Sequence, residues 1–140
     1  MPELITIDTS VIIAALRKQE KHYLACRAIL EQVNDRLYIA IEPYTVLVEI
    51  VAAIKRRTNS QKLSERVIKD ILSIDTIHFL DLDTTRAVRA VEIAQRFGVR
   101  GMDAIVIQMT EEFGATLVSL DMEMLEKVKT LVKIKELRSL

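Results

Sequence analysis

Hydrophobic residues along the chain form short apolar runs that alternate with longer segments of helical period. Short apolar runs are typical of buried strands, and apolar residues spaced three and four apart are typical of amphipathic helices. The alternation indicates an α/β fold with a mostly parallel sheet of four to five strands, and the continuously apolar runs predict helices on both faces. The predicted strands are 4–7, 37–41, 77–82, 115–120 and a short fifth at 131–134, and the predicted helices are 23–33, 44–57, 61–73, 84–97 and 102–113.

Local signals mark where several of these elements begin and end. Ser60 is a favourable N-cap for the helix that follows it, and Pro43 closes the second strand. Gly98 and Gly114 end the two helices that precede them. The chain has no linker, internal repeat or low-complexity segment. Its 140 residues, half of them hydrophobic, suit one core rather than two, so we expect residues 1–140 to form a single domain.

Carboxylate residues occur where such a fold binds its ligands, just beyond the strands. Asp8 directly follows the first strand, Asp121 directly follows the fourth, and Asp103 lies at the start of the preceding helix. Ligands of α/β sheets bind beyond the carboxyl ends of the strands, so Asp8 and Asp121 share a site if their strands are neighbours. Aspartate is also a favoured N-cap, and capping is therefore an alternative role for each. The same ambiguity applies to three neighbouring hydroxyl residues, Thr9, Ser10 and Ser119.

A fourth acid, Glu49, is the only charged residue in the apolar segment 44–54. On a helix it shares one face with Thr45 and with two small alanines, Ala52 and Ala53. A buried, unpaired carboxylate costs several kcal/mol and therefore needs a cation or a proton. The alternative is an exposed position on a surface helix, or an ion pair with Arg56.

The four carboxylates together suggest a metal site, because the sequence offers no matching set of nearby cations. A ligand set made only of oxygen favours Mg²⁺ or Mn²⁺ over zinc. Acidic clusters that hold such ions are common in phosphoryl transfer, where the metal activates a water and stabilises the leaving oxygen.

At these residues the sequence resembles the PIN-domain family, and within it the VapC-type ribonuclease toxins, over essentially the whole chain. That family opens with a strand leading into Asp-[Thr/Ser]-Ser and has a glutamate inside an apolar helix. Its third acid commonly sits in Arg-x-x-Asp-Ala, and its fourth follows a strand. The matching segments here are Ile7-Asp8-Thr9-Ser10, Val48-Glu49-Ile50, Arg100-Gly101-Met102-Asp103-Ala104 and Ser119-Leu120-Asp121-Met122-Glu123-Met124. The last segment departs from the commonest pattern, with Glu123 in place of an aspartate and Met124 in place of an aromatic residue.

The resemblance implies a PIN-like three-layer α/β/α fold and a metal-dependent endoribonuclease, the toxin of a toxin–antitoxin pair. In such an enzyme a water activated by Mg²⁺ or Mn²⁺ hydrolyses an RNA phosphodiester bond. The resemblance also implies a homodimer and a cognate antitoxin protein as partner. It assigns Asp8, Glu49, Asp103 and Asp121 as catalytic metal ligands, Glu123 as an additional candidate ligand, and Thr9, Ser10 and Ser119 as auxiliary residues.

Two other functions remain open on the sequence alone. One is a PIN-like nuclease that acts in RNA processing rather than as a toxin. The other is a non-catalytic PIN-like binding module, which the altered segment around Glu123 and the neutral overall charge would suit.

The charge is balanced overall but uneven along the chain. Twenty basic and 20 acidic residues give a net charge of zero and a pI of about 6.7, which excludes a non-specific binder of polyanions. Basic residues nevertheless cluster at the end of the helix 44–57 and near the third acid, where they could hold an RNA backbone. The alternative for the first cluster is favourable interaction with a helix C-terminus. The candidate substrate-binding residues are Lys55, Arg56, Arg57 and Arg100.

Other counts exclude further classes of protein. A single cysteine, Cys26, excludes an internal disulfide and a cysteine-built zinc site, and it suits a reducing compartment. No apolar run approaches the ~20 residues of a membrane span, and the first residues lack the pattern of a secretory signal. We therefore expect a cytoplasmic protein without membrane association.

Overall fold

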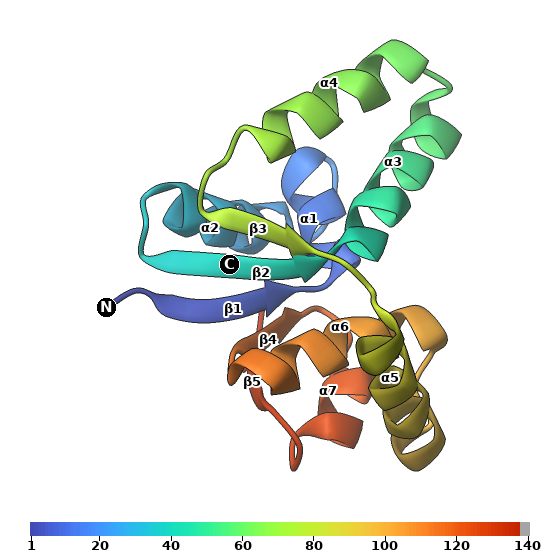
Figure 1. The fold of residues 1–140 in the computed structure, drawn as a ribbon. Coiled ribbons are helices and arrows are strands. Elements are labelled where there is room, and N and C mark those ends of the chain that lie inside the picture. Colours follow the sequence, from blue (N-terminus) through green and yellow to red (C-terminus); the bar gives the residue numbers. More distant parts are fainter. Residues whose placement is uncertain (138–140) are drawn as a thin grey trace.

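The computed structural model describes residues 1–137 of the chain, and in this part five parallel strands form one sheet (Figure 1). The strand order is β3-β2-β1-β4-β5, with every neighbouring pair parallel. This confirms the predicted α/β fold. The strands are β1 (Glu3–Ile7), β2 (Tyr38–Pro43), β3 (Ile77–Leu80), β4 (Thr116–Ser119) and β5 (Lys133–Glu136).

Helices in the same part of the chain connect the strands and cover both faces of the sheet. The chain runs from β1 to β2 and β3 in one direction, then crosses back to β4 and β5 on the other side of β1. Parallel crossovers are right-handed, so the first set of helices covers one face and the second set covers the other. The helices are α1 (Thr9–Leu16), α2 (Tyr23–Asn34), α3 (Tyr44–Thr58), α4 (Gln61–Leu72), α5 (Thr84–Phe97), α6 (Gly101–Phe113) and α7 (Met122–Val128).

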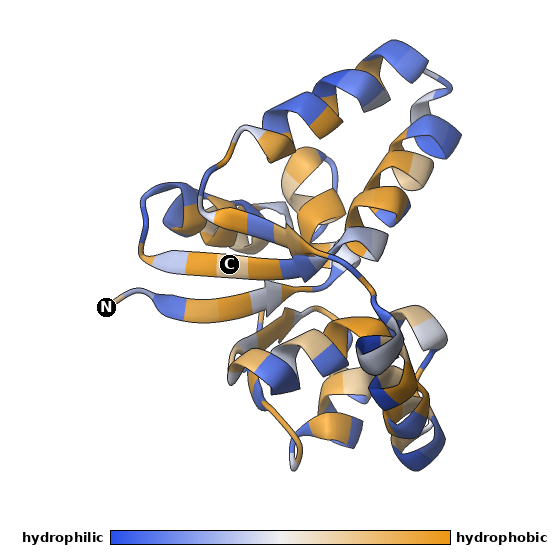
Figure 2. Cartoon of the chain, viewed as in Figure 1, coloured by the Kyte–Doolittle hydropathy of each residue, from blue (hydrophilic) through white to orange (hydrophobic). Residues whose placement is uncertain are grey.

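The core lies between these layers and is centred on β1 and β4. Ile5, Ile7, Leu117 and Val118 are fully buried, and Figure 2 shows hydrophobic residues along the central strands. The edge strands differ from the prediction that every strand is buried on both faces. In β5 the pattern is Lys-Ile-Lys-Glu, with only the isoleucine partly buried. An edge strand has a neighbouring strand on one side only, and three of the four residues of β5 are exposed.

Helix ends agree with the predicted signals. The Ser60 hydroxyl accepts a hydrogen bond from the Leu63 N–H and begins α4. Gly98 and Gly114 end α5 and α6 in the left-handed conformation, with φ of 66° and 60°. A residue with a Cβ is strained at such a φ, which explains why glycine ends both helices.

Two helices and one strand position differ from the sequence prediction. The short helices α1 and α7 were not predicted, and the fifth strand lies two residues later than 131–134. Six of the eight residues of α1 are buried, so its sequence has no polar face from which a helical period could be recognised. These differences matter, because α1 and α7 begin directly after Asp8 and Asp121.

Ion pairs fix α5 against α6. The Arg89 guanidinium donates two hydrogen bonds to the Glu111 carboxylate, and Arg86 does the same to Glu112. These guanidinium groups lower the pKa of both glutamates below their ordinary range. The contacts hold the helix that carries Asp103.

No helix in the described residues is long and apolar enough to span a membrane.

Candidate functional site

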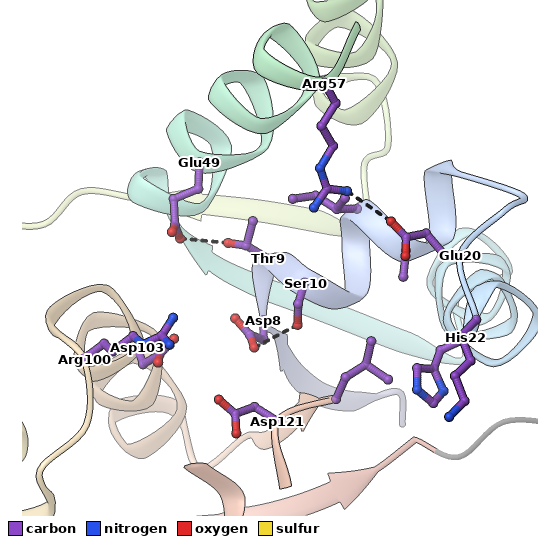
Figure 3. Close-up of a pocket in the computed structure, with 14 residues that line it drawn as sticks. Asp8, Thr9, Ser10, Glu20, His22, Glu49, Arg57, Arg100, Asp103 and Asp121 are labelled. Carbon is purple, nitrogen blue, oxygen red and sulfur yellow. Dashed lines mark hydrogen bonds and ion pairs between the residues drawn. The ribbon is translucent and has the colours of Figure 1, made fainter. Parts of the chain in front are cut away.

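The strand order reverses between β1 and β4, and this is where the acidic residues gather. The Asp8 N–H donates to the Val118 carbonyl at 3.0 Å, so the strands that lead into Asp8 and Asp121 are direct neighbours. All four predicted carboxylates line one cavity of about 390 Å³ beyond the carboxyl ends of these strands (Figure 3). They come from four separate parts of the chain: Asp8 from the β1–α1 junction, Glu49 from α3, Asp103 from α6 and Asp121 from the β4–α7 junction.

Asp8 stands at the N-cap position of α1, but its side chain makes no capping hydrogen bond. Instead its Oδ2 accepts hydrogen bonds from the hydroxyls of Ser119, at 2.9 Å, and Ser10, at 3.1 Å. Burial raises the pKa of Asp8, and these two hydrogen bonds oppose the rise. The structure therefore excludes side-chain capping for Asp8 and shows a carboxylate held in place by two hydroxyls.

Asp121 does act as a helix cap. Its Oδ1 accepts a hydrogen bond from the Met124 N–H at 3.0 Å, at the start of α7. The Ser119 hydroxyl oxygen accepts a hydrogen bond from the Asp121 N–H at 3.0 Å, and the same hydroxyl donates a hydrogen bond to the Asp8 carboxylate. Ser119 is fully buried and so links the two aspartates. The capping hydrogen bond therefore fixes the orientation of the Asp121 side chain, which is exposed and lines the cavity.

Glu49 is held by α1. Its Oε1 accepts a hydrogen bond from the Thr9 hydroxyl at 2.9 Å, and Thr9 itself is buried. The carboxylate is partly buried and bonded to a neutral hydroxyl, and it makes no ion pair with Arg56 in residues 1–137. Its charge is therefore balanced by no side chain in direct contact within the described structure.

Asp103 lies in the first turn of α6, where the helix dipole favours an anion. Its pKa is nevertheless raised to about 6. Burial is the largest cause, followed by repulsion from Asp8, Asp121 and Glu49, and the Arg100 guanidinium opposes the rise. The four carboxylates thus repel one another across the cavity.

The donor set suits a hard divalent cation. Within residues 1–137, no three His, Cys, Asp or Glu side chains lie close enough together to form a complete metal-binding set. Mg²⁺ keeps several of its waters and binds proteins through few carboxylates, so a spaced ring of oxygen donors is compatible with it. The repulsion that raises the pKa of Asp103 is what a bound cation would relieve. The residues present therefore fit a hydrated Mg²⁺ or Mn²⁺ ion.

The four basic residues predicted to bind substrate divide into two groups. Arg57 and Arg100 line the cavity with the carboxylates (Figure 3). Lys55 and Arg56 are exposed on α3 and are not among the residues that line it, and Lys55 donates to the Asn59 side chain. Glu123 is also set apart, because its side chain is 83% exposed and lies 3.6 Å from the Lys127 ammonium. It lines a smaller neighbouring cavity together with Asp103 and Asp121.

Three further charged or polar residues of the main cavity were not assigned to the site from the sequence. Glu20, Lys21 and His22 reach it from the segment between α1 and α2. The sequence offered no reason to assign them to the site: the residues around His22 do not have the spacing of a metal-binding or catalytic set, and the segment follows α1, a helix that its largely apolar sequence did not reveal. Their position depends on how α1 packs beside α3.

A buried glutamate beneath the site was also missed. Glu42, in β2, is fully buried, and its Oε1 accepts a hydrogen bond from the Ile7 N–H next to Asp8. Its Oε2 has no hydrogen-bond partner within residues 1–137. Burial raises the pKa of Glu42 well above its ordinary value, opposed by the Ile7 hydrogen bond and increased by Asp8. The sequence did contain a signal for Glu42: it is a charged residue between Ile41 and Pro43, at the end of an apolar strand.

A parallel sheet with four carboxylates at its point of strand reversal defines an α/β protein with an acidic site. The PIN domain family profile matches residues 5–130, and the chain belongs to this family. No curated protein shows significant sequence similarity to the chain.

Solved structures share the fold at low sequence identity. VapC20 of Mycobacterium tuberculosis, described as a sarcin–ricin loop cleaving toxin, is 14% identical with a TM-score of 0.75, over 94% of this chain and 98% of that one. VapBC2 of Rickettsia felis, bound to a DNA fragment from its promoter, is 15% identical with a TM-score of 0.71, over 96% and 99%. VapBC of Salmonella typhimurium, also bound to DNA, is 17% identical with a TM-score of 0.69, over 99% and 100%.

Proposed function

We propose that this protein is a metal-dependent endoribonuclease and the toxin of a toxin–antitoxin pair. The observation that carries the proposal is the set of four carboxylates, brought from four parts of the chain into one cavity and repelling one another there. Family membership supports a nuclease, and the shared fold with VapC20, a cleaving toxin, supports RNA as the substrate and the role of a toxin.

The residues of the site have three roles: binding the metal ion, orienting the carboxylates and binding the RNA backbone. Asp8, Glu49, Asp103 and Asp121 would hold Mg²⁺ or Mn²⁺, which when bound lowers the pKa of a coordinated water and offsets the charge of the phosphodiester. Ser10 and Ser119 keep the Asp8 carboxylate oriented, and Thr9 does the same for Glu49. Arg100, beside Asp103, supplies positive charge for the RNA backbone.

The test is cleavage of RNA by the purified protein with added Mg²⁺ or Mn²⁺, compared with the same reaction in chelator. We expect cleavage only with the metal, and growth arrest when the chain is expressed alone. Cleavage that persists in chelator would contradict the metal-dependent mechanism. Metal-dependent cleavage without growth arrest would contradict the toxin assignment and favour a role in RNA processing.

We also propose an antitoxin partner, a homodimer and a cytoplasmic location. Two of the structures with the same fold, VapBC2 and VapBC, are complexes bound to DNA, which supports an antitoxin that binds both DNA and this chain. Co-expression with the product of an adjacent short gene is expected to restore growth.

Light scattering of the purified chain is expected to give twice the mass of 16.0 kDa, and a monomer would contradict the proposed dimer.

Binding of Mn²⁺ is expected to weaken by about tenfold between pH 7 and pH 5. The raised pKa of Asp103, about 6, means that this carboxyl takes up a proton in that range, and a protonated carboxyl is a poor metal ligand. Calorimetric titration of wild type with Mn²⁺ at the two pH values measures the effect. The Asp103→Asn variant is expected to bind more weakly and with less dependence on pH. Equal affinity of wild type at both pH values would contradict a ligand role for Asp103.

A further inference from the structure

The cavity that holds the four carboxylates has positive charge at two opposite ends. Figure 3 shows Arg100 and Asp103 on one side of Asp8, and Arg57 with Glu20 and His22 on the other. Arg57 comes from the last turn of α3, and Lys21 lies next to Glu20 in the α1–α2 segment. The acidic centre therefore lies between two cationic groups that belong to different layers of the fold.

Arg57 is already paired with an anion of the protein. Its Nη1 donates to the Glu20 Oε1 at 3.1 Å, and the same oxygen lies 3.7 Å from Nη1 of Arg17. All three side chains are partly exposed, at 41% for Arg57, 34% for Glu20 and 28% for Arg17. Exposed ion pairs contribute little net free energy, because water and salt screen them. An incoming anion can therefore take the place of Glu20 on Arg57, while Glu20 keeps Arg17 as a partner.

The balance of charge indicates what that anion would be. Divalent cations would neutralise the four central carboxylates, which leaves Lys21, Arg57 and Arg100 against Glu20 alone among the charged residues that line the cavity. The remaining positive charge is split between the two ends. A ligand with regularly spaced negative charges, long enough to pass over the centre, matches this arrangement, and a nucleic-acid backbone has that form.

We propose that Arg57 forms a subsite for a phosphate of the RNA strand next to the scissile phosphate, at the end of the cavity opposite Arg100. In this proposal Glu20 is the resident anion that the phosphate displaces. The inference rests on the proposed ribonuclease function and adds the path of the strand, from Arg100 across the carboxylates to Arg57. Arg57 here is a substrate-binding residue, and Glu20 acts through it.

A purely structural role for the pair predicts a different behaviour of Glu20. If the ion pair only fastened α3 to the α1–α2 segment, then loss of either partner would loosen the same contact and impair the protein in the same direction. If Glu20 competes with phosphate, its neutralisation improves RNA binding and the loss of Arg57 weakens it. The opposite signs distinguish the two roles.

The experiment measures binding of a fluorescent single-stranded RNA oligonucleotide by anisotropy, with Ca²⁺ in place of Mg²⁺, and cleavage kinetics with Mn²⁺. Arg57→Ala is expected to weaken RNA binding by about 5- to 20-fold and to lower the slope of log affinity against log salt by about 0.7, the value for one phosphate of a single strand. The expected kinetic effect is a raised KM with kcat within about twofold of wild type. Arg27→Ala is the matched control, because Arg27 is an exposed arginine of α2, ion-paired with Glu31, that does not line the cavity.

Glu20→Gln is expected to tighten RNA binding by about 2- to 5-fold, as the loss of one exposed competing charge allows. This gain is expected to disappear when Arg57→Ala is also present, since the two residues then no longer interact. Weaker binding in Glu20→Gln, or equal binding by Arg57→Ala and Arg27→Ala, would overturn the subsite. Failure of wild type to cleave RNA would instead overturn the ribonuclease function, and the binding measurements would still decide the subsite.

Discussion

Asp8→Asn is expected to lower metal-dependent RNA cleavage by on the order of 10³-fold, the scale of several kcal/mol of charge stabilisation by a metal ion. Asp8 lines the same cavity as the other three carboxylates, and two hydroxyls hold its Oδ2 in place. The asparagine oxygen can still accept those hydrogen bonds, so the side chain keeps its position and loses its charge. The variant tests the charge of Asp8 separately from its shape.

Single-turnover cleavage with Mn²⁺ measures this effect, and thermal unfolding reports whether the fold is retained. Because burial raises the pKa of Asp8, its charged form is disfavoured in the fold, and we expect Asp8→Asn to be at least as stable as wild type at neutral pH. Asp75→Asn is the matched control. Asp75 forms an exposed ion pair with Arg36 at the opposite edge of the sheet, before β3. Wild-type cleavage rates in Asp8→Asn would contradict the proposed site.

Glu42→Gln is expected to raise the free energy of unfolding at pH 8 by about 1–3 kcal/mol, the scale of one buried polar group. Burial raises the pKa of Glu42 in the folded state above its ordinary value of 4.5. As the pH rises above 4.5, the unfolded chain loses this proton while the folded chain keeps it, so the stability of wild type falls. Glutamine does not titrate and keeps an acceptor for the Ile7 N–H.

Denaturant unfolding of both proteins at several pH values measures the difference. The advantage of Glu42→Gln is expected to shrink towards zero as the pH falls well below 4.5, where the glutamate is protonated in both states. Asp103 affects both proteins alike and cancels in the comparison, because Glu42 is not among the groups that shift its pKa. Glu3→Gln, at the exposed start of β1, is the control and is expected to change stability little. A less stable Glu42→Gln at pH 8 would contradict a protonated Glu42 in the folded state.

The candidate site was predictable because its acids stand at places that a sequence reveals. Asp8 and Asp121 each end an apolar run, and Glu49 interrupts one, so each is visible as a polar residue in an apolar context. Capping could not be decided in the same way. Asp121 caps α7 and Asp8 caps nothing with its side chain, although both occupy the same kind of junction. The difference arises because two serine hydroxyls, one of them from β4, bind the Asp8 carboxylate instead.

The basic residues were harder to assign. Lys55, Arg56 and Arg57 are consecutive in the sequence, yet only Arg57 reaches the cavity. Successive residues of a helix point about 100° apart, so the position of α3 beside α1 decides which of the three faces the site. Glu20, Lys21 and His22 could not be assigned at all, because α1 is buried and carries no helical period.

By itself the sequence determined the α/β class, the order of most elements and the identity of the four carboxylates. It did so because apolar runs, caps and helix-ending glycines are local signals. Only the tertiary structure decided that β1 and β4 are neighbours, that Glu42 lies buried beneath Asp8, and that Arg57 and Arg100 stand at opposite ends of one cavity. These facts depend on packing between segments far apart in the chain, and no local pattern records which segments meet.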